Sequence, residues 1–260
     1  MRKTTKFIIF TAVIIILAFT SAIQCSEQTV LYQVSTLNAL QEGVYDGAVS
    51  FESLAKHGDF GIGTFDGLDG EMVILNGSIY QVKADGKVYK PVATDKTPFA
   101  DVVKFTPDIS IHFVNGMDFA HLENKIIASL PSKNIPYAVM IKGQFSYVKT
   151  RSVKKQAKPY PRLAEAVKGQ AIFEMKNIKG TIIGYVMPQN FSGINMPGLH
   201  LHFIDDTGTK GGHLLDCVTV DCRLELCSIY SLELDFPHSA DFMKKDLSGD
   251  KLKELGKIEK

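Results

Sequence analysis

Residues 198–216 have the pattern of a β-strand, a short polar turn and a second β-strand, and they contain three of the seven histidines of the chain. Side chains alternate between the two faces of a strand, so His200 and His202 point to one face and the apolar residues between and beside them point to the other. The segment "DDTGTKGG" then reverses the chain, and His213 returns on the next strand. The pattern predicts an antiparallel hairpin that presents three imidazoles on a common face.

Strand-like segments separated by turn signals make up most of the chain. The pair Asn76-Gly77, which favours a two-residue turn, predicts a hairpin over residues 71–82. Short helices with capping residues or periodic apolar residues are expected at residues 36–43, 50–58 and 118–130. The expected fold class is therefore α+β (mixed α/β), with two lobes dominated by antiparallel or mixed β-sheet and a few short helices.

The polar segment Lys154–Arg162 contains two prolines and is the expected boundary between the lobes. We assign residues 26–155 to an N-terminal β-rich lobe. Residues 156–260 form a C-terminal β-rich lobe that carries the three histidines and a charged tail. Within these lobes, "YAVMIKGQFSYVKTRSV" reads as strands broken at Lys142-Gly143, and "GQAIFEMKN" and "GTIIGYVMP" read as two further strands.

The first 25 residues have the pattern of an export signal. Arg2, Lys3 and Lys6 are followed by the apolar run Phe7–Phe19 and by the small residues of "TSA". The apolar run is short for a membrane span. We expect residues 1–25 to be a signal peptide and the mature protein to be secreted or to lie in the cell envelope, with no stable membrane partner after cleavage. An uncleaved anchor is the alternative.

Charge and cysteine usage exclude two classes of partner or framework. A net charge of +1, without a long basic run, argues against a nucleic-acid partner. Three of the four cysteines lie in "CVTVDCRLELC", where strand alternation would place Cys217 and Cys227 on one face and Cys222 on the other. Cysteines so far apart on one extended strand cannot be bridged, so free thiols are expected.

Three histidines that converge on one point can hold a zinc ion and leave positions open for water or substrate. An H-x-H motif alone is a weak signal, but a third histidine across a short turn strengthens it. The alternative is that the histidines are structural. The stretch His57–Val73 contains five glycines and four acidic residues, and by itself it indicates a surface turn more readily than a binding loop.

Three stretches together resemble the bacterial α-acetolactate decarboxylases: "LYQVSTLNALQEGVYDG", "HGDFGIGTFDGLDGEM" and "GLHLHFIDDTGTKGGHLLD". They occur in the order and spacing of that family, and the resemblance extends from about Val30 to the C-terminal tail. It implies a two-lobed α/β fold with one zinc ion per chain. By this resemblance, the zinc ligands are His200, His202 and His213.

The resemblance also implies four further active-site residues. Thr64 corresponds to an active-site threonine and Arg151 to an active-site arginine of the family. Glu71 corresponds to an active-site glutamate. Glu259, in the closing "KIEK", corresponds to a glutamate that the tail of the family brings back to the metal, although Glu254 is a competitor for that position.

The implied reaction converts 2-acetolactate, a small β-keto acid, to acetoin and carbon dioxide without an organic cofactor. Zinc would hold the electrons left by carbon dioxide. Arg151 would orient the leaving carboxylate by a forked contact, and Glu71 or Glu259 would donate the proton. Asp216 is a candidate hydrogen-bond partner for one of the ligand histidines. The oligomeric state is left open, a homodimer included.

Two other classes of protein share parts of this pattern. A cupin-like metal oxygenase or isomerase also carries H-x-H on a strand, but it would have a glutamate where this chain has Asp205 and Asp206. Such a protein would bind iron or manganese. A non-enzymatic secreted module would use the histidines structurally and would bind no stoichiometric metal.

Overall fold

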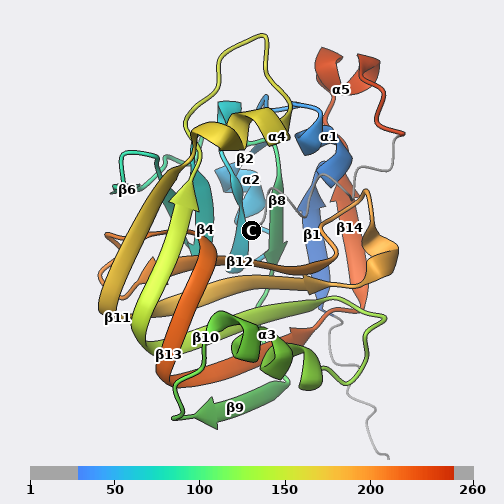
Figure 1. Cartoon of the computed structure of the whole chain (residues 1–260). Coiled ribbons are helices and arrows are strands. Elements are labelled where there is room, and N and C mark those ends of the chain that lie inside the picture. The colour runs from blue at the N-terminus through green and yellow to red at the C-terminus, as the bar shows by residue number, and fades with distance from the viewer. Residues whose placement is uncertain (1–28, 249–260) are drawn as a thin grey trace, which may run out of the picture.

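The computed structural model describes residues 29–248. The signal peptide predicted at residues 1–25 and the tail residues Glu254 and Glu259 lie outside this range. Within it, two large β-sheets pack against each other, and a few short helices lie at their margins (Figure 1). This architecture confirms the predicted fold class.

The first sheet has seven strands and is built mainly from the N-terminal half. Its order is β14 (Ser231–Asp235), β1 (Val30–Val34), β8 (Ala100–Val103), β3 (Phe60–Thr64), β4 (Glu71–Leu75), β5 (Ser78–Val82) and β6 (Val88–Tyr89). All neighbours are antiparallel except β1 and β14. The predicted hairpin at Asn76-Gly77 joins β4 to β5, and both turn residues have positive φ, as a primed turn requires. A separate pair joins β2 (Val49–Ser50) to β7 (Lys96–Thr97).

The second sheet has five strands, three of them long. Its order is β10 (Tyr137–Ser152), β11 (Ala171–Met187), β12 (Gly198–Asp205), β13 (Gly211–Ser228) and β9 (Ile109–Phe113). Because β10 also pairs with β13, the four strands β10, β11, β12 and β13 form a closed ring of hydrogen-bonded neighbours. The predicted breaks within β10 and β11 are wrong, since each strand is continuous. Gly143 serves close packing instead, because a Cβ there would lie 2.2 Å from the carbonyl oxygen of Asp221 on β13.

An irregularity in β13 corrects the predicted facing of the cysteines. The pairing with β10 skips one residue of β13, Val220, which reverses the alternation of side chains beyond it. Cys217 and Cys222 therefore pack in the same core cluster, inside the five-stranded sheet, and Cys227 faces the other sheet. All three are buried free thiols, as predicted, and burial raises the pKa of Cys222 to about 11.

Short helices cover the ends and one outer face of the sheets. They are α1 (Leu37–Gln41), α2 (Phe51–Leu54), α3 (Phe119–Ala128), α4 (Leu163–Ala166) and α5 (Ala240–Lys244), with single 3₁₀ turns at Asp66–Leu68, Val167–Gly169 and Gln189–Phe191. The side chains of Thr36, Ser50 and Asp118 accept hydrogen bonds from the first turns of α1, α2 and α3, so the predicted helices begin where their capping residues stand. In residues 29–248 no helix has the length and apolar character needed to cross a membrane.

The largest apolar clusters lie between the sheets and inside the five-stranded sheet. Phe60 and Val73 of the first sheet pack against Ile183 and Tyr185 of the second. Leu122 and Ile126, the buried residues of α3, belong to the same apolar cluster as buried residues of β10 and β13. The sheets exchange strands across residue 155, since β9 and β10 precede it and β14 follows it, and the division into lobes at that residue stays a prediction.

Candidate active site

The register of three neighbouring strands places the predicted metal ligands side by side. His202 on β12 is paired with His213 on β13, and His213 is paired with Arg151 on β10. His200 lies two residues before His202 and therefore on the same face of β12. Gly212, with φ of 131°, allows the close approach of β10 at this point, because a Cβ there would lie 2.5 Å from the carbonyl oxygen of Arg151.

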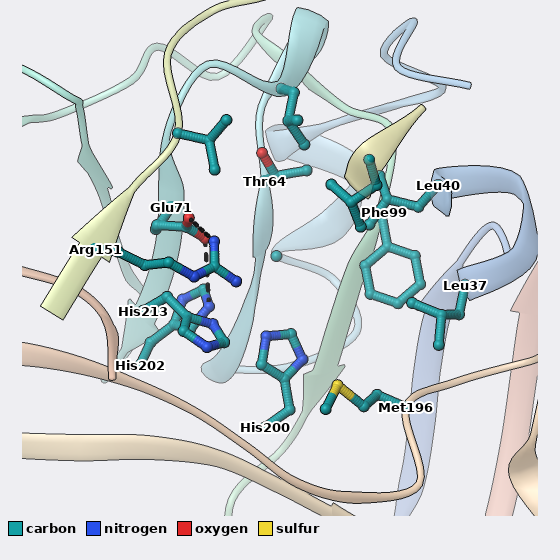
Figure 2. Close-up of a pocket in the computed structure, with 14 residues that line it drawn as sticks. Leu37, Leu40, Thr64, Glu71, Phe99, Arg151, Met196, His200, His202 and His213 are labelled. Carbon is teal, nitrogen blue, oxygen red and sulfur yellow. Dashed lines mark hydrogen bonds and ion pairs between the residues drawn. The ribbon is translucent and has the colours of Figure 1, made fainter. Parts of the chain in front are cut away.

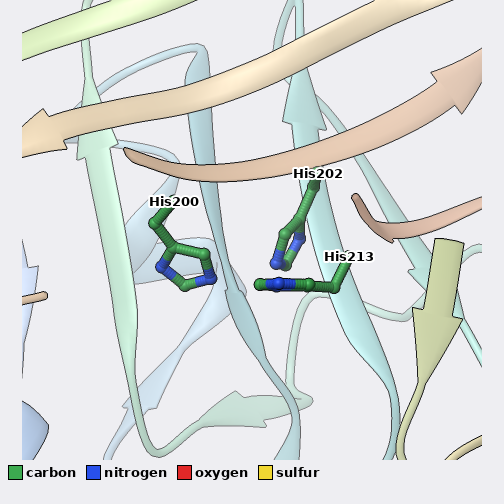
Figure 3. A group of neighbouring side chains, drawn as sticks. All are labelled: His200, His202 and His213. Carbon is green, nitrogen blue, oxygen red and sulfur yellow. The ribbon is translucent and has the colours of Figure 1, made fainter. Parts of the chain in front are cut away.

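The three imidazoles converge on one point, with their nitrogens within 4.8 Å of one another (Figure 3). Their ring centroids are 5.1 to 5.4 Å apart. His202 and His213 are buried and His200 is half-buried. An ion bound at about 2.0–2.1 Å from each nitrogen needs a cluster of this kind, so these residues could hold a metal ion.

The ring of His202 is held in one tautomer by a backbone group of the other sheet. Its Nδ1 lies 2.8 Å from the carbonyl oxygen of Met72 on β4. A carbonyl only accepts, so Nδ1 carries the proton. Burial, and then the nearby rings of His200 and His213, hold the pKa of His202 well below its usual range. The neutral ring therefore presents the lone pair of Nε2 to the cluster, as metal-ligating histidines do.

A buried ion pair lies beside this lone pair. Arg151 donates from Nη1 to Oε1 of Glu71 over 3.2 Å, and both side chains are almost fully buried. The other carboxylate oxygen, Oε2, lies 3.5 Å from Nε2 of His202. Two lone pairs that face each other this closely are stabilised by a cation or a proton placed beside them. The donor set of three imidazoles and one nearby carboxylate therefore fits a divalent ion such as zinc.

Thr64 completes the polar side of the site. It is paired with Glu71 across β3 and β4, so both side chains lie on the same face of the first sheet. Its hydroxyl donates to the carbonyl oxygen of Gly70 over 2.7 Å. The oxygen of Thr64 keeps its accepting lone pairs for a bound molecule.

These residues form one side of a pocket between the two sheets (Figure 2). The other side is apolar, and Figure 2 shows Leu37, Leu40, Phe99 and Met196 across the pocket from Arg151 and Glu71. The remaining lining residues are Gly63, Leu68, Val153 and Leu163. Such a pocket suits a small molecule with oxygen atoms at one end and alkyl groups at the other.

Six of the seven predicted site residues line this one pocket: Thr64, Glu71, Arg151, His200, His202 and His213. The seventh, Glu259, lies outside the described residues. The last described part of the chain lies against α1, which lines the pocket with Leu37 and Leu40. Asn38 donates from Nδ2 to the carbonyl oxygen of Leu247 over 2.8 Å, and Nζ of Lys245 donates to the carbonyl oxygen of Glu42.

Two parts of the site were not predicted from the sequence. In residues 29–248, Asp216 makes no hydrogen bond with the three histidines, and the carbonyl of Met72 has that role for His202. A backbone carbonyl has no signature in a sequence. The apolar side of the pocket was also missed, because its leucine, phenylalanine and methionine residues have the same pattern as ordinary core residues.

Comparisons with known proteins confirm the resemblance found in the sequence. The family model described as alpha-acetolactate decarboxylase matches residues 31–249. The alpha-acetolactate decarboxylase of Methanosarcina mazei is 46% identical over 233 residues, which cover 89% of this chain and 80% of that protein. The Bacillus subtilis protein of that name is 42% identical over 217 residues, covering 84% of this chain and 85% of that one. The crystal structure of alpha-acetolactate decarboxylase from Bacillus subtilis strain 168 superposes with a TM-score of 0.86 at 40% identity, covering 88% of this chain and 99% of that one.

His200 and His202 should respond differently to substitution. We expect both His200→Ala and His202→Ala to lose bound metal. Only His202→Ala should also lower the free energy of unfolding, by about 1–3 kcal/mol, because it leaves the buried Met72 carbonyl without its donor. Metal analysis and denaturant unfolding measure the two effects. The exposed His112, replaced by alanine, is the control. Full metal occupancy in either variant would contradict the assignment of ligands.

Proposed function

The chain belongs to the alpha-acetolactate decarboxylase family, and on that premise we propose that it is a zinc-dependent carboxy-lyase that converts 2-acetolactate to acetoin and carbon dioxide. One observation carries the proposal: three imidazoles and the Glu71–Arg151 pair form one side of a pocket whose other side is apolar. The oxygen atoms of 2-acetolactate suit the polar side, and its two methyl groups suit the apolar side.

Zinc is the ion we propose, because imidazole nitrogens dominate the donor set. When bound, zinc would supply a Lewis acid that stabilises the electron pair left on the substrate when carbon dioxide departs. The cupin-like alternative needs a carboxylate ligand shortly after the H-x-H motif. Asp205 is committed to the β12–β13 turn, where its Oδ1 accepts from the backbone N–H groups of Thr209 and Lys210 over 2.7 and 2.8 Å. This argues against the alternative.

The other polar residues have separate roles in the proposal. Arg151 would hold the substrate carboxylate by a forked contact, and Glu71 keeps the guanidinium oriented before substrate arrives. The bond between the carboxylate carbon and the hydroxyl-bearing carbon breaks, and its electron pair stays with the rest of the substrate as carbon dioxide leaves. A glutamic acid must then protonate the hydroxyl-bearing carbon. The guanidinium beside Glu71 stabilises the carboxylate form of that residue. Glu259 is therefore the proton donor we favour.

The place of the reaction is part of the same proposal. The export signal expected at residues 1–25 would bring the enzyme to the cell envelope or to the medium. The enzyme would then bind and decarboxylate its substrate outside the cytoplasm.

The direct test is to supply racemic 2-acetolactate to the purified protein and follow carbon dioxide and acetoin. We expect equimolar products, loss of turnover after treatment with a chelator, and recovery on addition of zinc. Unchanged turnover in the chelator-treated, metal-free protein would contradict the metal-dependent mechanism. Recovery with iron or manganese but not with zinc would contradict the choice of zinc.

Replacing Arg151 by lysine should not preserve activity. Lysine keeps the charge but cannot contact Glu71 and a substrate carboxylate in one plane, so we expect kcat/KM to fall about 100-fold or more. Steady-state kinetics of Arg151→Lys measures the loss. Arg223→Lys, at an exposed arginine of β13, is the matched control. Parental activity in Arg151→Lys would show that only the positive charge at this position is needed, and not the forked contact.

The tail should be dispensable for the fold but not for catalysis. Deleting residues 256–260 should leave Tm nearly unchanged and lower kcat by a factor on the order of 100 or more, the usual cost of losing a positioned proton donor. The contact of Leu247 with α1 brings the described end of the chain to the element that lines the pocket. We expect Glu259→Gln to reproduce the loss and Glu254→Gln not to do so. Full activity in the truncated chain would leave Glu71 as the donor.

A further inference from the structure

The loop of residues 188–197 connects β11 to β12 and carries Met196 into the pocket. It is hydrogen-bonded to the first turn of α1. The backbone N–H of Leu37 donates to the carbonyl oxygen of Ile194 over 2.8 Å, and that of Asn38 donates to Gly193 over 3.2 Å. The first N–H groups of a helix have no partner within the helix, so the loop supplies their acceptors. Loop and helix therefore form one unit, which carries part of the apolar side of the pocket.

A buried carboxyl group of the first sheet holds this unit. Nδ2 of Asn195 lies 2.9 Å from both carboxyl oxygens of Asp101 on β8 and 2.8 Å from Oε1 of Gln33 on β1. Gln33 donates in turn from Nε2 to the carbonyl oxygen of Ile194 over 2.8 Å. Oδ1 of Asn195 accepts from the backbone N–H of Met196 over 2.7 Å. Asp101 is thus connected to the pocket residue Met196 through a single side chain.

The position of Asp101 is costly for a carboxyl group. Asp101 is 1% exposed, as is Asn195, and in residues 29–248 no cationic side chain pairs with it. Burial raises the pKa of Asp101 to about 7, against the opposing effect of the Asn195 hydrogen bonds. Burial, and then the nearby Asp101, raise the pKa of Tyr185 on the opposite sheet well above its usual range. An apolar residue at this place in the sheet would avoid the desolvation cost of a buried carboxyl group. The hydrogen bonds to Asn195 therefore explain why an aspartate is found here.

We propose that Asp101 and Asn195 are positioning residues that set the apolar side of the pocket relative to the three histidines. The proposal rests on the proposed function in assigning this side to the methyl groups of 2-acetolactate. The histidines are held separately, because His200 and His202 are fixed by pairing with β11 and His213 by pairing with β10 and β12. Loosening the loop should therefore weaken substrate binding and leave metal binding intact.

The test compares Asp101→Asn, Asn195→Ala and the exchanged pair Asp101→Asn/Asn195→Asp in the full protein. We expect each single variant to raise KM for 2-acetolactate about tenfold and to change kcat little, the signature of lost uniform binding. Metal content should stay at the parental value. The backbone amides of Leu37 and Asn38 should exchange with deuterium faster than in the parent. The exchanged pair should recover neither effect, because a carboxylate at position 195 would face the accepting Oε1 of Gln33, whose Nε2 is held by the carbonyl oxygen of Ile194.

Thr219→Val is the matched control. Thr219 is buried, and its hydroxyl is hydrogen-bonded to the backbone of Met117 away from the pocket, so its loss costs stability without touching the loop. It should change neither KM nor amide exchange in α1. Unchanged amide exchange in both single variants would overturn the proposal, as would a loss of bound metal or an unchanged KM. If the parent does not turn over 2-acetolactate, the proposed function and the substrate assignment fail together. Amide exchange then still decides whether Asp101 holds the loop.

Discussion

The register of β13 with β10 and β12 is the constraint on which the site depends. It sets His213 beside His202 of β12 and beside Arg151 of β10. A slip of one residue in either pairing would turn these side chains to the opposite face. The same strand must also bury Leu214 and Cys217 in the core of its own sheet, although they are three residues apart. A second irregularity in β13, an extra residue between the partners of Lys149 and Thr150, lets the strand bury both Leu214 and Cys217. This irregularity is therefore part of the construction of the site.

The seven-stranded sheet supplies hydrogen-bond partners for polar side chains of the five-stranded sheet. Polar groups buried between the sheets find their partners across the interface. Arg151 contacts Glu71, His202 contacts the Met72 carbonyl, and Ser152 donates to the carbonyl oxygen of Val82. Each sheet alone would lack these contacts, and an unpaired buried polar group costs several kcal/mol. The packing of the two sheets therefore sets the orientation and tautomer of His202, a candidate metal ligand.

Local signals in the sequence predicted much of this arrangement. The alternation around His200 and His202, the polar turn and the Asn76-Gly77 pair act over a few residues, and each produced the expected hairpin. The predicted cap at Ser50 also lies where expected, and the helices expected at residues 36–43 and 118–130 are present. Properties that depend on distant partners could not be predicted in this way. Gly143 looked like a break but serves close packing against β13, and the facing of Cys222 depends on a skipped residue. The roles of the Met72 carbonyl and of Asp101 exist only after the sheets and the loop have packed together.

The most direct measurement of the central claim is anomalous diffraction at the zinc absorption edge from crystals of the purified protein. We expect one zinc ion among His200, His202 and His213, at about 2.0–2.1 Å from each ligand nitrogen. We further expect His202 to bind it through Nε2 while its Nδ1 keeps the Met72 carbonyl as partner. Zinc-soaked crystals without an anomalous peak between these three rings, or with His202 turned away from the ion, would contradict the proposed metal site.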